Sequence, residues 1–120
     1  MIKLLIADDH HLFRDGLSRI INEIPEFDLR AVAQNGKEAL DFALQHQPDV
    51  VLMDLHMPEM NGIEATEQIL AQNPDIHILI LTISEEDVDL FTALRAGAGG
   101  YLLKNTSSQN LISAIKDIVA

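Results

Sequence analysis

The sequence has no cysteine, and only eight basic residues stand against nineteen acidic ones, which gives a formal net charge of −11 over 120 residues. Without cysteine there can be neither a disulfide framework nor a thiolate metal site, and we expect a reducing compartment, the cytoplasm. A charge of this sign repels phosphate backbones and anionic lipid headgroups. These residues are therefore not expected to bind nucleic acid or a membrane surface themselves.

Long hydrophobic runs are also missing. The apolar stretch at the N-terminus stops at Asp8 and Asp9, too early for a secretory signal peptide. No other run approaches the roughly 18 apolar residues of a membrane span. What is present, 48% hydrophobic and 22% charged residues, fits one compact soluble domain over residues 1–120.

Apolar blocks alternate with helical patterns along the chain, five times in the order strand then helix. The first, third and fourth blocks are almost continuous Leu, Ile and Val, which is typical of strands buried on both faces of a parallel sheet. The second alternates and the fifth is short, which places both at the sheet edges. Expected strands span residues 3–8, 29–34, 49–54, 76–82 and 100–104. Right-handed crossovers then predict a flavodoxin-like, doubly wound α/β fold, (βα)5, with strand order 2-1-3-4-5.

Between the strands, apolar residues three and four apart indicate amphipathic helices. Short polar residues with a partner three positions later indicate where four of these helices begin. These pairs are Asn35 with Glu38, Asn61 with Glu64, Ser84 with Asp87, and Thr106 with Gln109.

Polar residues follow or end four of the five predicted strands: Asp8 and Asp9, then Asp54, Thr82 and Lys104. Because the carboxyl ends of parallel strands meet at one rim, we expect these side chains to be neighbours. Three carboxylates need a cation to stay ionised together, and an oxygen ligand set suits Mg²⁺. Beside a metal and Lys104, the Asp54 carboxylate could attack phosphorus and form an aspartyl phosphate.

These residues carry a resemblance to a known family. The chain resembles the receiver domains of two-component response regulators over its whole length, through Asp8-Asp9, the segment MDLHMPEMNG at 53–62, Thr82 and Lys104. The segments DDHHLFRDGL at 8–17 and GYLLK at 100–104 resemble the NarL/FixJ subgroup, whose receivers precede a LuxR-type helix-turn-helix. The resemblance implies a CheY-like fold.

The resemblance also implies the chemistry of the acceptor. Asp54 is expected to be the phospho-acceptor, loaded from a phosphohistidine of a sensor histidine kinase. Asp8 and Asp9 are expected to hold Mg²⁺ together with Asp54 and the backbone carbonyl of His56.

The same resemblance implies a switch. Lys104 pairs with the phosphoryl oxygens, Thr82 bonds the phosphoryl group, and the rotamer of Tyr101 follows Thr82. The face made by the fourth helix, fifth strand and fifth helix then changes shape, because phosphorylation biases a pre-existing equilibrium. One departure is Asn105, which stands where the family usually has a proline in a cis peptide. The Lys104–Asn105 peptide is thus either trans or a costly cis bond.

The expected output is transcription, through a C-terminal DNA-binding domain outside these 120 residues, with a phosphorylation-dependent homodimer as a further expectation. We expect a signalling protein that transfers and loses a phosphoryl group on its own Asp54, not a dedicated enzyme. Alternatives are a stand-alone phosphorelay receiver and an aspartyl-phosphate phosphohydrolase, in which His56 would replace the usual acid as general acid/base. A third is an interaction module locked in one state.

Taken singly, several of these residues have ordinary explanations. Asp8 and Asp9 could cap the first helix, Lys104 could be a surface lysine, and Tyr101 could simply pack at the sheet edge. The five histidines lie on different predicted elements without i, i+4 spacing, so we expect no histidine metal site. His10 and His11 are interpreted as the start of the first helix.

Overall fold

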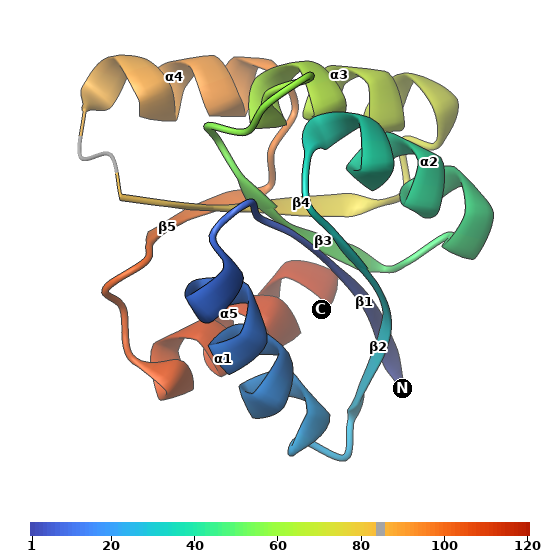
Figure 1. The fold of residues 1–120 in the computed structure, drawn as a ribbon, viewed down its shortest axis with the longest axis vertical. Helices are drawn as coiled ribbons and strands as arrows, with labels where there is room; N and C mark the ends of the chain where they lie inside the picture. Colours follow the sequence, from blue (N-terminus) through green and yellow to red (C-terminus); the bar gives the residue numbers. More distant parts are fainter. Residues whose placement is uncertain (84–85) are drawn as a thin grey trace.

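Five parallel strands and five helices alternate in the computed structural model, which describes residues 1–83 and 86–120 (Figure 1). The strands are β1 (Ile2–Ala7), β2 (Phe27–Ala33), β3 (Val50–Asp54), β4 (His77–Thr82) and β5 (Gly100–Leu103). The helices are α1 (His11–Asn22), α2 (Gly36–His46), α3 (Gly62–Gln72), α4 (Asp87–Arg95) and α5 (Ser108–Val119). The sheet order is β2-β1-β3-β4-β5, which confirms the predicted doubly wound fold with β2 and β5 at the edges.

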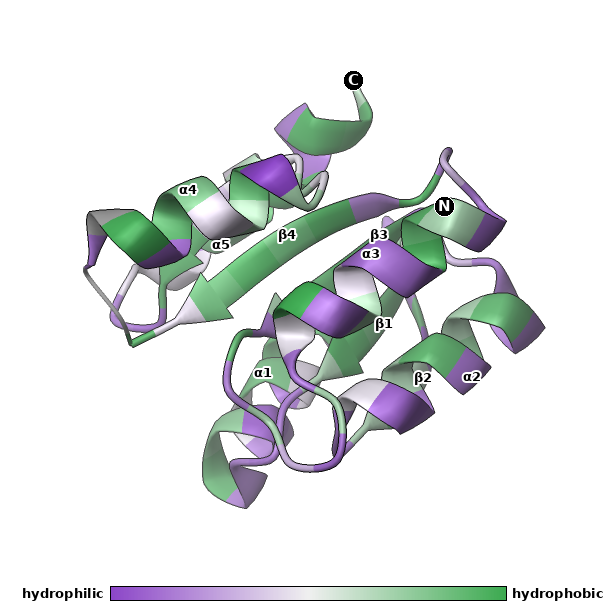
Figure 2. Ribbon diagram, turned by 90° about the horizontal axis from the view of Figure 1, so that it is seen from above, coloured by the Kyte–Doolittle hydropathy of each residue, from purple (hydrophilic) through white to green (hydrophobic). Residues whose placement is uncertain are grey.

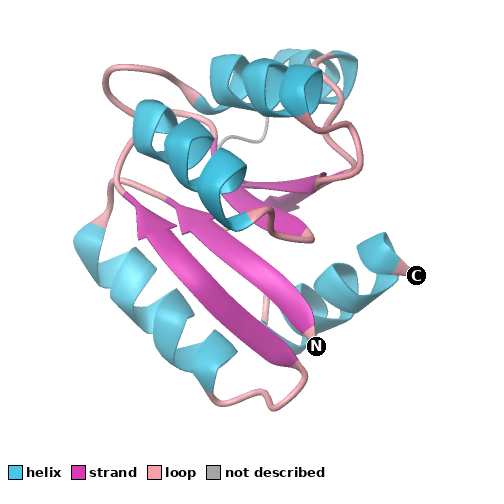
Figure 3. Cartoon of the chain, turned by 90° about the vertical axis from the view of Figure 1, so that its right-hand side faces the viewer, coloured by secondary structure: helices cyan, strands magenta, loops and turns pink. Residues whose placement is uncertain are grey.

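Helices cover both faces of the sheet (Figures 1 and 3). Because successive strand residues point to opposite faces, each central strand supplies two separate cores. In β1, Leu4 and Ile6 pack with α1 and α5, whereas Leu5 and Ala7 pack with α2 and α3. The near-continuous apolar runs of β1, β3 and β4 are thus explained by burial on both sides.

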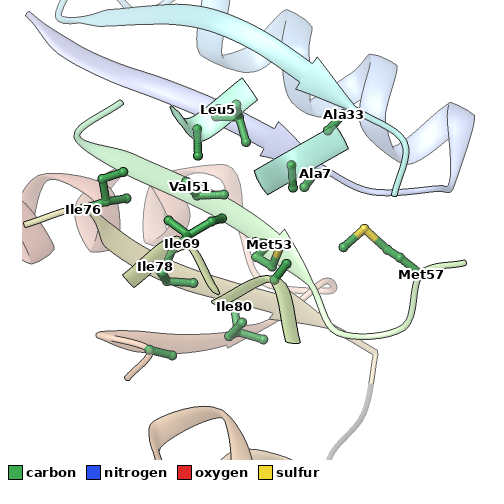
Figure 4. Close-up of a cluster of buried hydrophobic side chains, with 14 of the residues drawn as sticks. Leu5, Ala7, Ala33, Val51, Met53, Met57, Ile69, Ile76, Ile78 and Ile80 are labelled. Carbon is green, nitrogen blue, oxygen red and sulfur yellow. The ribbon is translucent and has the colours of Figure 1, made fainter. Parts of the chain in front are cut away.

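The core beneath α2, α3 and α4 is built from aliphatic strand residues and small helix residues. Figure 4 shows Val51, Met53, Ile78 and Ile80 pointing into this layer, with Ile69 of α3 among them. Alanines of the facing helices, which bring those helices close to the sheet, complete the cluster at positions 39, 43, 65 and 93. Burial of these residues is the main source of stability.

Helix starts follow two of the predicted caps. The side chains of Asn35 and Asn61 accept the backbone N–H groups of Glu38 and Glu64, at 2.8 and 2.9 Å. The prediction for α5 was wrong by one residue: Ser107, not Thr106, is the N-cap. The N–H of Thr106 closes a turn onto the Leu103 carbonyl, so Thr106 lies before the helix entrance. Ser84, predicted to cap α4, lies outside the described residues.

Strand β2 begins at Phe27, two residues before its predicted start. Phe27 pairs with Ile2, and the register of β1 against β2 shifts by one residue between Leu4 and Leu5. Polar residues gather on the loops and outer helix faces, with the apolar strands between them (Figure 2). On α4, however, Val88, Phe91 and Leu94 are exposed. Within the described residues, no helix is long and apolar enough to cross a bilayer.

Candidate functional site

The carboxyl ends of β1 and β3 bring two acidic residues together. Ala7 is paired with Met53, so the next residue of each strand, Asp8 and Asp54, stands at the same rim. Both are almost completely buried, with exposed fractions of 2% and 3%. Because every second side chain of a strand points to the same face, Asp8 and Asp54 point toward α1 and α5. Leu4, Ile6, Val50 and Leu52 point the same way.

Lys104 joins this pair from the end of β5. Its backbone N–H donates to the Thr82 carbonyl at 2.8 Å, which extends the β4–β5 ladder by one residue. Its Nζ lies 2.7 Å from Asp8 Oδ2 and 3.5 Å from Asp54 Oδ2. The ammonium also lies 4.7 Å from the centre of the Phe13 ring, in cation–π range. Lys104 is therefore a buried counter-charge to two carboxylates.

The pKa of Asp54 is raised to about 6, because burial and the negative charge of Asp8 raise it more than the charge of Lys104 lowers it. A carboxyl with such a pKa is still ionised at neutral pH. It is also destabilised as an anion, because one ammonium is shared between two buried carboxylates. This is the state expected of a group that reacts through its anionic form.

Two oxygens at this rim have no hydrogen-bond partner among the described residues, although they are buried: Asp9 Oδ1 and Asp54 Oδ2. Buried polar atoms without a partner are uncommon and indicate a missing ion or water. Carboxylate oxygens of Asp8, Asp9 and Asp54 lie within 4.8 Å of one another. The residues therefore fit a small divalent cation bound by oxygen.

Thr82 and Tyr101 lie on the other side of the sheet from the acids. Thr82 ends β4 and is fully buried. Its side chain points to the same face of the sheet as those of Ile78 and Ile80, which belong to the core beneath α2, α3 and α4. Tyr101 lies opposite Ile80 in the β4–β5 register and packs against the same core. The predicted switch residues thus share one face, next to α4.

His56 lies in the loop after β3, and its side chain is exposed. Its Nε2 lies 4.0 Å from Asp89 Oδ2 of α4, so the ring is directed away from the acids. After Lys104, the peptide to Asn105 is trans, since no cis peptide occurs in the described chain. Of the two possibilities for the Lys104–Asn105 peptide, trans or a costly cis bond, the structure therefore has the trans bond.

Three residues of the first helical turn reach the site without having been predicted to do so. His10 Nδ1 lies 2.9 Å from Asp8 Oδ1 and 3.0 Å from Lys104 Nζ. Phe13 packs against the Lys104 ammonium, and the buried Arg14 donates to the Asp8 carbonyl at 2.9 Å. In the sequence, these residues follow directly after the two acids at the rim. That position indicates only that they lie near the site, because the first turn of a helix folds back over the strand end before it.

Comparisons with known proteins give matches over nearly the whole chain. A family model described as the response regulator receiver domain matches residues 4–116. The oxygen regulatory protein NreC of Staphylococcus carnosus is 44% identical over 118 residues, covering 98% of this chain and 54% of that protein. The transcriptional regulatory protein DegU of Brevibacillus brevis is 41% identical over 115 residues, covering 96% and 49%. The chain thus spans about half the length of the curated relatives it matches.

Solved structures show the same fold over the whole chain. A two-component response regulator of the LuxR family from Aurantimonas sp. SI85-9A1 has a TM-score of 0.94 at 34% identity, covering 99% of this chain and 85% of that one. A DNA-binding response regulator of the LuxR family from Staphylococcus aureus has a TM-score of 0.95 at 26% identity, with both chains covered completely.

Proposed function

The chain belongs to the response regulator receiver domains of two-component systems, and from that membership we propose that it is a signalling switch in which Asp54 accepts a phosphoryl group. The donor is a phosphohistidine of a sensor histidine kinase. The observation that carries the proposal is the buried Asp54 carboxylate, with its pKa raised to about 6, beside Asp8 and the Lys104 ammonium.

In the transfer, an ionised Asp54 oxygen attacks phosphorus in line with the bond to the donor imidazole. A P–O bond forms and the P–N bond breaks, and its electron pair stays on the imidazole nitrogen, which takes a proton. Lys104, already 3.5 Å from Asp54 Oδ2, neutralises charge on the phosphoryl oxygens. The product is an aspartyl phosphate.

Asp8, Asp9 and Asp54, with the backbone carbonyl of His56, would hold Mg²⁺. When bound, the ion neutralises phosphoryl oxygens and fixes their orientation. The buried, unpartnered oxygens of Asp9 and Asp54 within the described residues support this assignment. Asp8 has a second task, since its Oδ2 holds the Lys104 ammonium at 2.7 Å and keeps it at the rim.

We assign the conformational response to Thr82 and Tyr101. Tyr101 packs against the core beneath α4, Thr82 shares that face by the alternation of side chains along β4, and the Thr82 carbonyl accepts the backbone N–H of Lys104. A movement of the Thr82 hydroxyl toward a phosphoryl group on Asp54 alters the space beside Tyr101. The exposed Val88, Phe91 and Leu94 on α4 make the face formed by α4, β5 and α5 a suitable surface for a partner or a second copy of the chain.

For the output, we propose control of transcription by a C-terminal DNA-binding domain outside these 120 residues, in a cytoplasmic protein. The two curated relatives, which are about twice as long as this chain, are named as regulatory proteins, and one solved structure is titled a DNA-binding response regulator. These names support the proposal. A stand-alone receiver in a phosphorelay would use the same site. A dedicated phosphohydrolase is disfavoured, because the His56 ring lies near Asp89 rather than Asp54.

Incubation with an acyl phosphate and Mg²⁺ tests the proposal by intact-protein mass spectrometry. We expect one added phosphoryl group, its absence in Asp54→Asn, and its retention in Asp41→Asn, an exposed acid of α2. A phosphorylated Asp54→Asn variant would overturn the acceptor assignment. Beryllium fluoride with Mg²⁺ should also shift the NMR signals of α4 and β5, whereas unchanged spectra would favour a locked interaction module.

A further inference from the structure

His10 places a ring nitrogen among the carboxylates. The residue is the N-cap of α1, directly after Asp8 and Asp9. Its Nδ1 lies 2.9 Å from Asp8 Oδ1, 3.4 Å from Asp9 Oδ1 and 3.7 Å from Asp54 Oδ2. The nitrogen therefore lies among the oxygens of the three acids, while the side chain as a whole is 56% exposed.

The same nitrogen also faces a cation. Lys104 Nζ lies 3.0 Å from His10 Nδ1, and an ammonium can only donate. That contact is a hydrogen bond when Nδ1 carries a lone pair and no proton. The contact with Asp8 Oδ1 needs the opposite tautomer, with the proton on Nδ1, and this oxygen can accept it beside the backbone N–H of His10 at 2.8 Å. In the tautomer that bonds Lys104, the imidazole lone pair is directed at a positive charge, which is the arrangement found in metal-bound histidine.

An independent observation points to a ligand at this place. Asp54 Oδ2, on a side chain 4% exposed, and Asp9 Oδ1 are buried without a hydrogen-bond partner in residues 1–83 and 86–120. Ligand atoms of an octahedral ion with bonds of about 2.1 Å lie about 3 Å apart when adjacent and about 4.2 Å apart when opposite. The three separations from His10 Nδ1 fall within these limits.

We propose that His10 Nδ1 is a direct ligand of the divalent ion held by Asp8, Asp9 and Asp54, and that the site therefore prefers a first-row transition ion such as Mn²⁺ to Mg²⁺. This inference rests on the metal site of the proposed function and adds a ligand to it. Oxygen ligands suit Mg²⁺ and Mn²⁺ alike, whereas imidazole nitrogen suits first-row transition ions, so the added nitrogen is what favours Mn²⁺ over Mg²⁺. A mixed set of three carboxylates and one nitrogen shifts the preference accordingly.

Mn²⁺ alone, added to the whole chain, tests the ligand directly. Electron spin-echo envelope modulation detects the hyperfine coupling of a nitrogen bound to Mn²⁺. We expect this coupling in the wild type, its loss in His10→Ala, and its retention in His77→Ala, an exposed histidine at the start of β4. Mn²⁺ that binds the wild type without nitrogen coupling would overturn the inference and leave the proposed function intact.

Affinities give a second readout. Titrations with Mn²⁺ and with Mg²⁺ should show that His10→Ala lowers the preference for Mn²⁺ at least about tenfold, the lower end of what losing even an outer-shell partner of a metal ligand costs. An unchanged ratio in a variant that still binds both ions would refute the role of His10. A wild type that binds neither ion would refute the proposed metal site itself.

Discussion

At the scale of single residues, the site holds two buried carboxylates with only one ammonium beside them among the described residues. Asp8 and Asp54 are buried within reach of one ammonium, Lys104, and the pKa of Asp54 rises from 3.8 to about 6 as a result. A buried carboxylate that keeps its charge at neutral pH weakens the fold. In the proposed function, this charged form of Asp54 is the one that attacks phosphorus.

Replacing Asp54 by Asn should stabilise the metal-free protein at pH 7.5 by about 1 to 3 kcal/mol. The unfolded chain releases the Asp54 proton near pH 3.8, whereas the folded chain holds it to about pH 6. Stability is therefore lost as pH rises through this window, and the gain in Asp54→Asn should vanish at pH 4. Urea unfolding of both proteins at the two pH values measures the difference, with Asp41→Asn as control. An equal gain at both pH values would contradict the assigned charge effect.

Arg14 is a second residue whose effect can be measured. The residue is 7% exposed and its guanidinium donates to the Asp8 carbonyl at 2.9 Å, so it fixes the loop that carries the acids. Arg14→Met keeps an apolar stem but leaves that carbonyl without its donor, which should cost about 1 to 3 kcal/mol. Arg19→Met, on the exposed side of α1, should change stability by less than about 0.5 kcal/mol. Similar losses in both variants of α1 would argue against the role of Arg14.

The contrast between predicted and unpredicted site residues has a physical cause. Asp8, Asp54 and Lys104 could be placed from the sequence, because strand ends in a parallel sheet meet at one rim. His10 and Arg14 could not, since their reach depends on how the first turn of α1 is rotated over that rim. The functional roles of Thr82 and Tyr101 stay predictions, although the structure places both beside the core under α4.

At the scale of elements, α3 begins in direct contact with the end of β3. The N–H of Gly62 donates to the Leu55 carbonyl at 2.8 Å, and a Cβ at Gly62 would overlap the Asp54 carbonyl oxygen. The first residue of α3 therefore has to be glycine for reasons of space. This contact links the end of β3 to the helix that follows it.

Gly62→Ala should destabilise the protein by about 1 to 3 kcal/mol, because the backbone of Asp54 has to move away from the added methyl group. Gly16 is the matched control: it lies within α1, where an added Cβ meets no described atom within 4 Å. Gly16→Ala should therefore stabilise α1 by about 0.5 to 1 kcal/mol through helix propensity. Thermal unfolding of both variants should give shifts of opposite sign; shifts of the same sign would rule out this explanation.

Helices and strands were predictable from the sequence where the spacing of apolar residues and the type of capping residue indicated the same structure. The apolar runs of β1, β3 and β4 and the caps at Asn35 and Asn61 each point to one structure. The start of α5 was misplaced because Thr106 and Ser107 are both good capping residues, and the turn closed onto Leu103 decides between them. That turn depends on where β5 ends, which local sequence does not specify.

At the scale of the whole molecule, the net charge of −11 and the acidic rim make stability sensitive to cations in two ways. Salt of any kind screens the overall charge, whereas a divalent ion at the proposed site of Asp8, Asp9 and Asp54 would bind only the folded state. The two effects differ in size and in their dependence on particular residues.

Mg²⁺ at about one hundred times its dissociation constant should stabilise the fold by about 2.7 kcal/mol, or raise the melting temperature by roughly 8 to 12 °C. NaCl at the same ionic strength should give a much smaller increase. Asp9→Asn, which removes one carboxylate from the cluster, should lose most of the Mg²⁺ effect and keep the NaCl effect. Equal shifts with both salts in the wild type would mean that screening alone is at work.

The strand order has a consequence for the time course of synthesis. Asp8 and Asp54 are brought together by the pairing of β1 with β3, but Lys104 is added to the chain 50 residues after Asp54. At about 5 to 20 residues per second, a ribosome needs roughly 3 to 10 s to cover that interval. A nascent chain that pairs these strands during the interval holds its acids without their lysine. The first counter-ions of these two carboxylates are then the free cations around the ribosome.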